Sequence, residues 1–332
     1  MTSPQDNGIV FGVESTFGTI PTLNRWTEPL GDATFNLNKK IVQGQGLRVG
    51  SRVARAGRRV IPRYDPTATF TVEAASKGQG LLWQALLGAC TSTLVSSATY
   101  QQNATIGDAP PSLSIQQSLY NAGTAALDPY TWTGMMCDSF DIDFPNADML
   151  RIKTNWKGKS ALPNTATVVP AFTVPTAVTN FQFAGASITT GTLTAATATA
   201  LASSTTTLAD IRGGRISVNR NLNVRPNVGG DAKPVPGLTT ITGKLDIEYD
   251  STTFRDAVLN DTPMAIVLTW VGAALGVGVE TLQIQLPAVL FDSDLAQMNG
   301  TDIPMIPGTF QVLDNLSVSP ITIITRTADL AL

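Results

Sequence analysis

The sequence predicts a mainly β protein with two short helices, and three observations support this prediction. Nine segments alternate apolar and polar residues with a period of two and are rich in β-branched and aromatic residues, which is the pattern of strands with one buried face. Only two segments have the apolar spacing and flanking residues of a helix. Charged residues make up 14% of the 332 residues, well below the usual value of about 25%, as in chains whose surfaces become buried against other subunits.

The predicted strands are short and are separated by turns. They span residues 67–74, 140–144, 149–156, 181–194, 215–224, 243–249, 265–270, 281–286 and 321–326. The apolar run 263–279 contains four glycines and prolines and is short for a membrane-spanning helix of about 20 residues, so we expect a strand, a turn and a second strand in a soluble protein. The Thr/Ala-rich stretch 189–209 is expected to be a hairpin that carries an insert.

Residues 76–88 and 250–261 are the two predicted helices. In the first helix, Ser76 is the expected N-cap and Gly88 the expected end, because a hydroxyl accepts a free backbone N–H and glycine adopts the left-handed conformation. In the second helix, the expected N-cap is Asp250 or Ser251. The apolar stripes that we expect to be buried are Leu82, Trp83 and Leu86 in the first helix and Phe254, Ala257 and Val258 in the second.

The predicted elements recur in the same order in the two halves of the chain, which indicates an internal duplication. In each half a strand, a long loop and a second strand precede the helix, and a strand that ends in proline follows it. The similarity of Phe140–Pro145 to Leu282–Pro287 keeps apolar and polar positions in register. We therefore expect two β units, residues 1–180 with a long basic loop at 36–66, and residues 181–332 with the insert at 189–209.

The composition excludes several kinds of active site. The chain has no histidine, which excludes Ser-His-Asp and Cys-His arrangements, imidazole acid–base catalysis and His-ligated zinc. The two cysteines, Cys90 and Cys137, stand in separate stretches, as is typical of buried free thiols in a reducing compartment. The stretches GQGLRVG and GVGVE lack the strand–turn–helix context of a nucleotide site. We expect neither an enzyme nor a cofactor or metal.

Alternating carboxylates give two predicted strands an acidic face. Asp141 and Asp143 alternate with apolar residues in one strand, and Asp246 and Glu248 do so in another. Since side chains of a strand point to alternate faces, these acids lie opposite the buried face. Paired carboxylates can perform acid–base work or hold Mg²⁺ or Ca²⁺, but no nucleophile or lysine stands at a helpful spacing. The other interpretations are a solvated sheet face and a channel wall that repels DNA phosphates.

Basic residues are concentrated in the stretch LRVGSRVARAGRRVIPRY at 47–64. Its six arginines are Arg48, Arg52, Arg55, Arg58, Arg59 and Arg63. Residues 33–64 carry a charge of +8, and the rest of the chain, with 14 basic and 25 acidic residues, carries −11. Nucleic-acid binding favours arginines interleaved with aromatics or placed along a helix, but this stretch has only Tyr64 and several glycines. We interpret it as a contact with an acidic surface of another copy, through arginine–carboxylate pairs; DNA binding and a solvated loop are the alternatives.

Five segments stand in a characteristic order along the chain: GVESTFGTIP, QGLRVGSRVARAGRRV, FTVEAASKGQGLLWQALLG, LDIEYDSTTFRDAVLNDTPMAIVLTWVG and LQIQLPAVLFD. Together they resemble the tail tube (major tail) proteins of long-tailed phages that infect actinobacteria and related hosts. They cover most of the chain, from Gly12 to about Thr325, and their order is more specific than any single motif. The insert at 189–209 departs from the family pattern.

The resemblance implies a structural virion protein without catalysis or cofactors. It implies β-sandwich or barrel units with flanking short helices, assembled into stacked rings whose shared β-barrel lines a lumen for DNA during ejection. By position, 36–66 would reach a neighbouring ring, and Asp141, Asp143, Asp246 and Glu248 are candidate lumen-facing acids. The partners would be the chain itself, as three copies per pseudo-hexameric ring if it is duplicated and six otherwise, and other tail proteins at the tube ends.

The same resemblance implies a place in the virion tail, with assembly in the cytoplasm of the host bacterium, transit of DNA without specific binding, and no membrane. Two alternatives belong to other classes. One is a DNA-binding β protein that uses the arginines of 47–64. The other is a different tail component, such as a terminator or a decoration protein.

Overall fold

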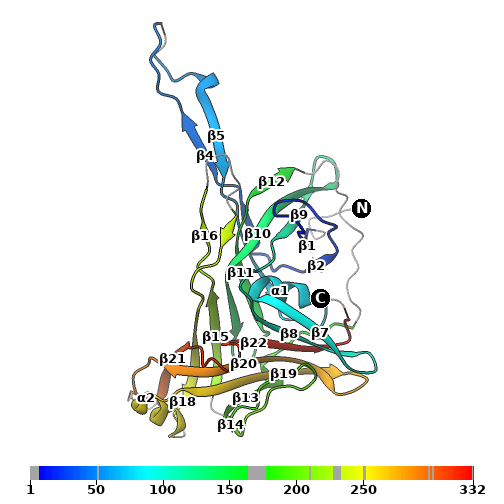
Figure 1. The fold of residues 1–332 in the computed structure, drawn as a ribbon, viewed down its shortest axis with the longest axis vertical. Coiled ribbons are helices and arrows are strands. Elements are labelled where there is room, and N and C mark those ends of the chain that lie inside the picture. Colours follow the sequence, from blue (N-terminus) through cyan, green and yellow to red (C-terminus); the bar gives the residue numbers. More distant parts are fainter. Residues whose placement is uncertain are drawn as a thin grey trace.

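The computed structural model describes residues 7–50, 52–163, 177–208, 211–226, 233–249, 252–297, 300, 303–330 and 332. The described residues form 22 strands and two α-helices (Figure 1). The mainly β fold predicted from the sequence is therefore confirmed. All the strand pairs that these residues form are antiparallel, which allows strands close in sequence to be joined by short turns.

The elements follow one another along the chain with two helices set among the strands. Up to residue 163 they are β1 (Gly8–Val13), β2 (Arg25–Thr27), β3 (Thr34–Asn36), β4 (Lys39–Gln43), β5 (Arg59–Tyr64), β6 (Thr67–Glu73), α1 (Gly80–Leu87), β7 (Gly88–Ser96), β8 (Thr99–Ile106), β9 (Leu113–Asn121), β10 (Ala126–Phe144), β11 (Arg151–Lys157) and β12 (Ser160–Pro163). After it they are β13 (Ala186–Gly191), β14 (Thr206–Leu208), β15 (Ile211–Asn219), β16 (Asn223–Val224), β17 (Pro234–Val235), β18 (Thr240–Glu248), α2 (Thr253–Asn260), β19 (Met264–Ala274), β20 (Val279–Phe291), β21 (Met305–Val312) and β22 (Thr322–Thr327).

The nine predicted strands overlap β6, β10, β11, β13, β15, β18, β19, β20 and β22, but the prediction missed β1, β7, β8, β9, β21, most of β10 and several short strands. The missed strands β8 and β9 bury polar side chains as well as apolar ones, namely Gln101, Gln102 and Gln116, each at most 3% exposed. Such residues break the apolar alternation on which the prediction depends. The run 263–279 forms β19, a turn and the start of β20, as predicted. In the described part of the chain, no helix is long and apolar enough to span a membrane.

Both predicted helices form, but their N-caps differ from the prediction. Gln79 is the N-cap of α1, and the hydroxyl of Ser76 instead accepts a hydrogen bond of 3.1 Å from the backbone N–H of Thr179. Gly88 has a φ of +108° and ends α1 as predicted. The N-cap of α2 is Thr252, and the predicted caps lie outside the described residues. The apolar stripes are buried at Leu82, Trp83, Leu86, Phe254 and Ala257, and Val258 is half-buried.

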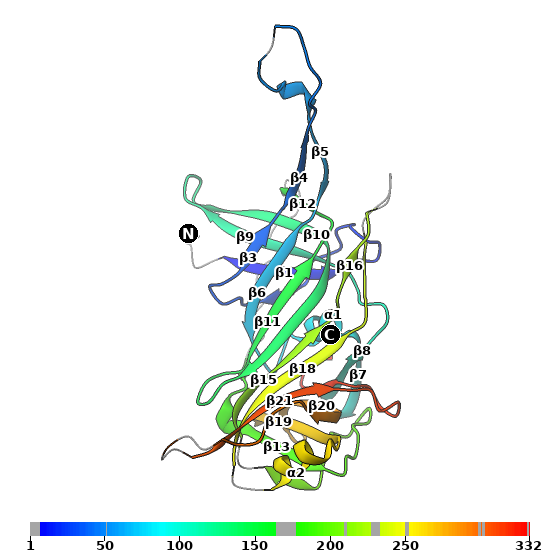
Figure 2. The ribbon, with the colours of Figure 1, turned by 90° about the vertical axis from the view of Figure 1, so that its left-hand side faces the viewer.

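A central sheet runs in the order β3–β6–β11–β10–β15–β18–β21–β20 (Figure 2). Ile152 of β11 lies between Val72 of β6 and Ile142 of β10, and Ile142 also pairs with Ile216 of β15. All four side chains are buried. One face of this sheet therefore packs on the core, and alternation places polar side chains on the other face.

The first halves of the two long strands leave the central sheet and enter a second layer. There β10 pairs with β9 and β12, and β20 pairs with β19 and β22. Strand β22 continues this layer through β8 to β7. Among the described strands, no series of pairs returns to its first strand, so hydrogen bonds do not close the single chain into a barrel. The barrel part of the predicted architecture is not present within one chain.

The strand pairs of the first half recur in the second half in the same chain order. The pairs β1–β2, β1–β9, β9–β10, β10–β11, β10–β12, β6–β11 and β3–β6 correspond to β13–β14, β13–β19, β19–β20, β20–β21, β20–β22, β18–β21 and β15–β18. A helix follows β6 and β18 in turn, and the hairpins β4–β5 and β16–β17 stand at equivalent places. The division of the chain near residue 180 stays a prediction.

The two similar segments that suggested duplication are not structural counterparts. Residues 140–144 pair with β11 and β15 in the central sheet. Residues 282–286 instead pair with β19 and β22 in the second layer. The short sequence match is therefore offset from the repeat that the strand pairs reveal.

A buried carboxylate fastens the loop after β1. Glu14, part of the stretch GVESTFGTIP, is 7% exposed. It accepts hydrogen bonds from the backbone N–H groups of Gly18 and Gly134, both at 2.7 Å, and from the hydroxyls of Ser112 at 2.8 Å and Ser114 at 2.7 Å. These four charge-assisted bonds join the loop to β9 and β10 and satisfy a carboxylate that burial would otherwise destabilise.

A buried arginine joins the two halves. Arg220 follows β15 and is 2% exposed. Its guanidinium donates to the backbone carbonyl oxygen of Leu86 at 3.1 Å, near the end of α1, and to that of Gly107 at 2.6 Å. The carbonyl end of a helix carries partial negative charge, which favours this contact. Burial lowers the pKa of the Arg220 guanidinium from its ordinary value.

We expect Glu14→Ala to destabilise the unassembled protein by about 3 kcal/mol, because four buried donors lose their acceptor. Urea unfolding measures the change. The exposed Glu28 lies in the same region of the sequence, and Glu28→Ala is the matched control, expected to change stability by less than about 0.5 kcal/mol. Equal effects of the two substitutions would contradict the role of Glu14.

Candidate assembly surfaces

The basic loop of the sequence forms an arm that projects from one end of the molecule (Figures 1 and 2). Strands β4 and β5 pair along it, with Val42 opposite Val60 and Gln43 opposite Arg59. The arm continues the β3–β6 hairpin of the central sheet beyond the body. An isolated two-stranded hairpin is marginally stable in water, so a partner surface is expected to stabilise the arm.

The six predicted arginines have different surroundings in the arm. Arg48, Arg52, Arg58 and Arg59 are exposed, whereas Arg55 and Arg63 are half-buried. Arg63 forms an ion pair with Asp65 at 2.8 Å. The Arg58 side chain packs over Gly46, where any Cβ atom would collide with its guanidinium. Arg48, Arg52 and Arg59 make no ion pair with the described residues, in contrast to Lys40 and Arg63, which both pair with Asp65.

Large apolar side chains of the arm are also exposed. Leu47 and Val49 near its tip are 100% exposed, and Val53 is 79% exposed. Ile41, Val42, Val60 and Ile61 are between 42% and 56% exposed. A soluble monomer rarely displays so many apolar side chains together. With its exposed arginines, the arm therefore has both the apolar and the cationic features of a protein-binding surface.

Helix α2 lies at the end of the molecule opposite the arm (Figures 1 and 2). Within 248–261 and 292–297, the described acids are Glu248, Asp256, Asp261, Asp292 and Asp294, and the one described base is Arg255. Leu259 is 60% exposed and Leu295 39% exposed there. An apolar cavity of about 270 Å³ opens between Val258, Leu295 and Ile306. This end is complementary to the arm in both charge and polarity.

The four acids predicted to share a sheet face are interleaved there with bases. Arg215 lies 2.5 Å from Asp141 and 3.2 Å from Asp143. Lys244 forms an ion pair with Asp246 at 2.8 Å, and Arg212 forms one with Glu248. The acids therefore lie on the polar face of the central sheet, but the face has mixed charge. The sequence alternation located the carboxylates and missed Arg212 and Arg215, which lie on the neighbouring strand β15, and Lys244, which lies on β18 itself.

Burial and ion pairing affect this face unequally. Burial raises the pKa of Asp143 from its ordinary value, and the nearby Arg215 opposes this effect without cancelling it. The hydrogen bond to Asp141 raises the pKa of Arg215. Asp141 also accepts a hydrogen bond of 2.6 Å from the hydroxyl of Ser217. Asp141 is thus the well-partnered acid of the pair, and Asp143 is the less stable one in its ionised form.

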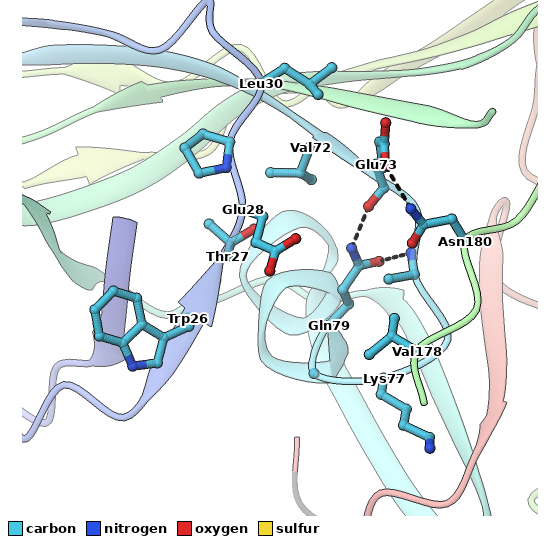
Figure 3. A pocket seen from close by; sticks show the side chains of 13 residues that line it. Trp26, Thr27, Glu28, Leu30, Val72, Glu73, Lys77, Gln79, Val178 and Asn180 are labelled. Carbon is cyan, nitrogen blue, oxygen red and sulfur yellow. Dashed lines mark hydrogen bonds between the residues drawn. The ribbon is translucent and has the colours of Figure 1, made fainter. Parts of the chain in front are cut away.

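A cavity of about 460 Å³ lies among β2, the end of β6 and the start of α1 (Figure 3). The Gln79 side chain donates to the backbone carbonyl oxygen of Glu73 at 2.6 Å, and Asn180 donates to the Glu73 carboxylate at 2.6 Å. The second bond fastens the segment around Asn180 to the end of β6.

Other candidate chemistry is also missing from the described residues. They contain no cluster of three or more Cys, Asp or Glu that could hold a metal ion. Cys90 and Cys137 are free thiols, as predicted, but only Cys137 is buried, and Cys90 is half-buried. Burial raises the pKa of Cys90 to about 12 and also raises that of Cys137, so both thiols are protonated and poor nucleophiles.

The Thr/Ala-rich insert is held against the second layer by glutamines. Thr189 of β13 pairs with Thr207 of β14, which confirms the predicted hairpin. The Gln283 side chain donates to the backbone carbonyl oxygen of Ala202 at 3.0 Å and accepts from its N–H at 2.8 Å. Gln101 donates to the carbonyl oxygen of Thr197 at 2.8 Å. The insert therefore has a defined path that its low-complexity sequence did not predict.

Comparison with known proteins gives one result that covers nearly the whole chain. The family model described as "Phage tail tube protein" matches residues 4–312. No curated protein matches the chain.

We expect Asp143→Asn to raise the urea midpoint of the unassembled protein at pH 7. A raised pKa means that the folded state favours protonated Asp143, so its ionisation destabilises the fold at neutral pH, and this cost disappears as the pH falls through about 3.9. The stabilisation by asparagine should therefore vanish below about pH 4. Asp141→Asn is the control, expected to lower the midpoint at pH 7. A gain at Asp143→Asn that is the same at pH 3 and pH 7 would contradict the assignment.

Proposed function

Since the chain belongs to the phage tail tube protein family, we propose that it is the structural subunit of a tail tube, which copies of the chain build as stacked rings around a DNA channel. The observation that carries this proposal is the placement of a basic, partly apolar arm and an acidic, partly apolar surface at opposite ends of one chain. A head-to-tail contact between unlike surfaces generates an open assembly, because each added copy presents a new free end.

The arm is proposed to reach the acidic α2 end of a copy in the next ring. Arg48, Arg52 and Arg59 are available for carboxylates such as Asp256, in the first turn of α2, and Asp261, its C-cap. Bidentate arginine–carboxylate pairs are directional as well as attractive. Burial of Leu47 and Val49 in the same contact would remove the most exposed apolar side chains of the arm from water.

Each ring is proposed to contain three copies. The repeated strand pairs give one chain two equivalent β units, so three chains supply the six units of a pseudo-hexamer. A ring of six copies is the alternative if the units do not alternate around the ring.

The polar face of the central sheet is the proposed lining of the channel. Asp141, Asp143, Asp246 and Glu248 would face the lumen together with Arg215 and Lys244. Mixed charge on a channel wall offers DNA phosphates neither a continuous basic track to bind nor a uniformly repulsive surface. DNA would therefore pass without specific binding.

The proposal places the protein in the virion tail, in contact with other tail proteins at the two ends of the tube, after assembly in the cytoplasm of the host bacterium. The two free thiols are consistent with assembly in a reducing compartment. No enzymatic step belongs to this function.

Electron microscopy of the purified protein tests the proposal directly. We expect rings or tubes with a central channel and threefold symmetry. A persistent monomer at high concentration would overturn the proposal. Rings that never stack would favour a tail terminator, and salt-sensitive retention on DNA would favour the alternative in which the exposed arginines of 47–64 bind nucleic acid.

The triple variant Arg48→Glu, Arg52→Glu and Arg59→Glu is expected to abolish stacking, because it brings like charges together at the contact. The matched control replaces the same three residues by lysine, keeps the charge, and should retain at least part of the assembly. Adding Asp256→Lys and Asp261→Lys to the glutamate variant should restore tubes. Sedimentation and electron microscopy measure the outcome; normal tubes from the glutamate variant would refute the arm contact.

A further inference from the structure

We propose that neighbouring copies within a ring are joined by a strand pair that the chain already forms once internally. In this pair, residues 292–297 extend β20 of one copy and pair antiparallel with residues 33–38 of the next copy, which contain β3. The inference rests on the proposed function, because it concerns the contact between copies of one ring.

The internal model for this contact is the junction of β10 and β15. Residues 139–144 of β10 pair with residues 214–219 of β15 in an unbroken ladder, with Ile142 opposite Ile216 and Asp141 opposite Ser217. Ile142 and Ile216 are fully buried, and the hydroxyl of Ser217 donates to Asp141 at 2.6 Å. This junction joins the two repeated sets of strands into one sheet.

The repeat assigns a counterpart to each side of the junction. Glu73 ends β6 and pairs with Arg151, and Glu248 ends β18 and pairs with Met305. If the pair Glu73–Arg151 is equivalent to the pair Glu248–Met305, β6 is aligned with β18 residue by residue. The partner of β6, β3, is then the counterpart of β15, with Phe35 in the place of Ile216 and Asn36 in the place of Ser217.

Paired residues in the neighbouring strands also locate the counterpart of residues 139–144, the end of β10. Met135 is opposite Leu113 where β10 leaves β9, and Val289 is opposite Met264 at the equivalent place in β20. Counting along the ladders to β11 and β21, which in β10 includes one bulged residue, gives residues 292–297 as the counterpart of 139–144. Two independent neighbours, β9/β19 and β11/β21, therefore give the same alignment.

Both counterpart segments lack a strand on one side in the single chain. Among the described strands, β3 pairs with β6 alone, and residues 305–309 of β21 pair with β18 alone. Residues 292–297 run beside that open edge without being a strand, although the N–H of Asp292 donates to the carbonyl oxygen of Thr309 at 3.0 Å and begins the ladder. Open edges of this kind are usually paired or covered.

The side chains fit the proposed register. Asp294 would lie opposite Asn36 of the next copy, where the asparagine amide can donate to the carboxylate as Ser217 does to Asp141. Leu295 would lie opposite Phe35, which already packs at ring distances of 6.3 Å and 5.4 Å from Phe70 and Trp132. Leu295 is 39% exposed in the single chain, whereas its counterpart Ile142 is fully buried. This difference is expected if the strand that would cover Leu295 comes from the next copy.

A cysteine pair tests this register in assembled protein. Chains carrying Asn36→Cys are mixed with chains carrying Asp294→Cys, both in a Cys90→Ala background, and the assembly is oxidised. We expect a covalent dimer with one chain of each kind, confirmed by mass spectrometry of the linked peptides. The double variant should give a ladder that ends at a circular trimer, which also counts the copies in a ring.

The matched control pairs Asn36→Cys with Ala296→Cys, two residues further along the same face. Its diagonal separation of about 7–8 Å exceeds the usual Cα range of a disulfide, so we expect at least about fivefold less product. Equal yields from the two pairs would overturn the register.

Hydrogen exchange of the wild-type protein gives a second readout that needs no substitution. The amides of 33–38 and 292–297 should gain protection when the protein assembles. Rings that form without this protection and without the cysteine bond would overturn the strand pair while leaving the tail tube function intact. A wild type that never assembles would overturn both.

Discussion

Backbone hydrogen bonding between β10 and β15 is the interaction on which the architecture depends. It joins the four strands of the first half to the four strands of the second half in one central sheet. Every open edge of a sheet is a row of unpaired donors and acceptors that must be paired or covered. The edge of the first half at β10 is paired with β15 within the chain. At the two ends of the sheet, β3 and residues 305–309 of β21 each lack a partner on one side among the described strands. These two open edges are the basis of the strand pair that we propose between neighbouring copies.

Charge is segregated along the same molecule. The arm carries exposed arginines and exposed aliphatic side chains, and the end near α2 carries carboxylates and leucines. Between them, the polar face of the sheet holds acids and bases in contact, as Arg215 is with Asp141 and Asp143. The proposed contact between copies would use the unlike charges at the two ends. The proposed channel lining would instead use the face on which acids and bases are paired.

Buried polar side chains fix the loops that this β-rich architecture leaves between its layers. Glu14 holds the loop after β1, Arg220 holds the second half against α1, and Gln283 holds the insert. Each has several hydrogen-bond partners, which is the condition for burying a polar group without a large cost. None of the three belongs to a catalytic arrangement. Their signal in the sequence is weak, because isolated polar residues in strand-like segments look like solvated positions.

The sequence by itself determined the features that depend on neighbouring residues. The β class, the hairpin at 263–279, the two helices and the end of α1 at Gly88 follow from local alternation, turn residues and backbone preferences. The absence of histidine and the concentration of arginines are also properties of the sequence alone, and the ordered segments were enough to indicate the family.

Only the tertiary structure decided the features that depend on residues far apart in the chain. The strand β8 escaped prediction because it buries Gln101 and Gln102, whose side chains donate to the distant carbonyl oxygens of Thr197 and Asp329. Asp141 and Glu248 looked isolated because their partners Arg215 and Arg212 come from another strand, β15. Arg58 differs from Arg52 because it packs over Gly46 across the arm. Strand register, side-chain pairing and open edges arise from long-range contacts, and no local pattern of residues can specify which distant strand completes a sheet.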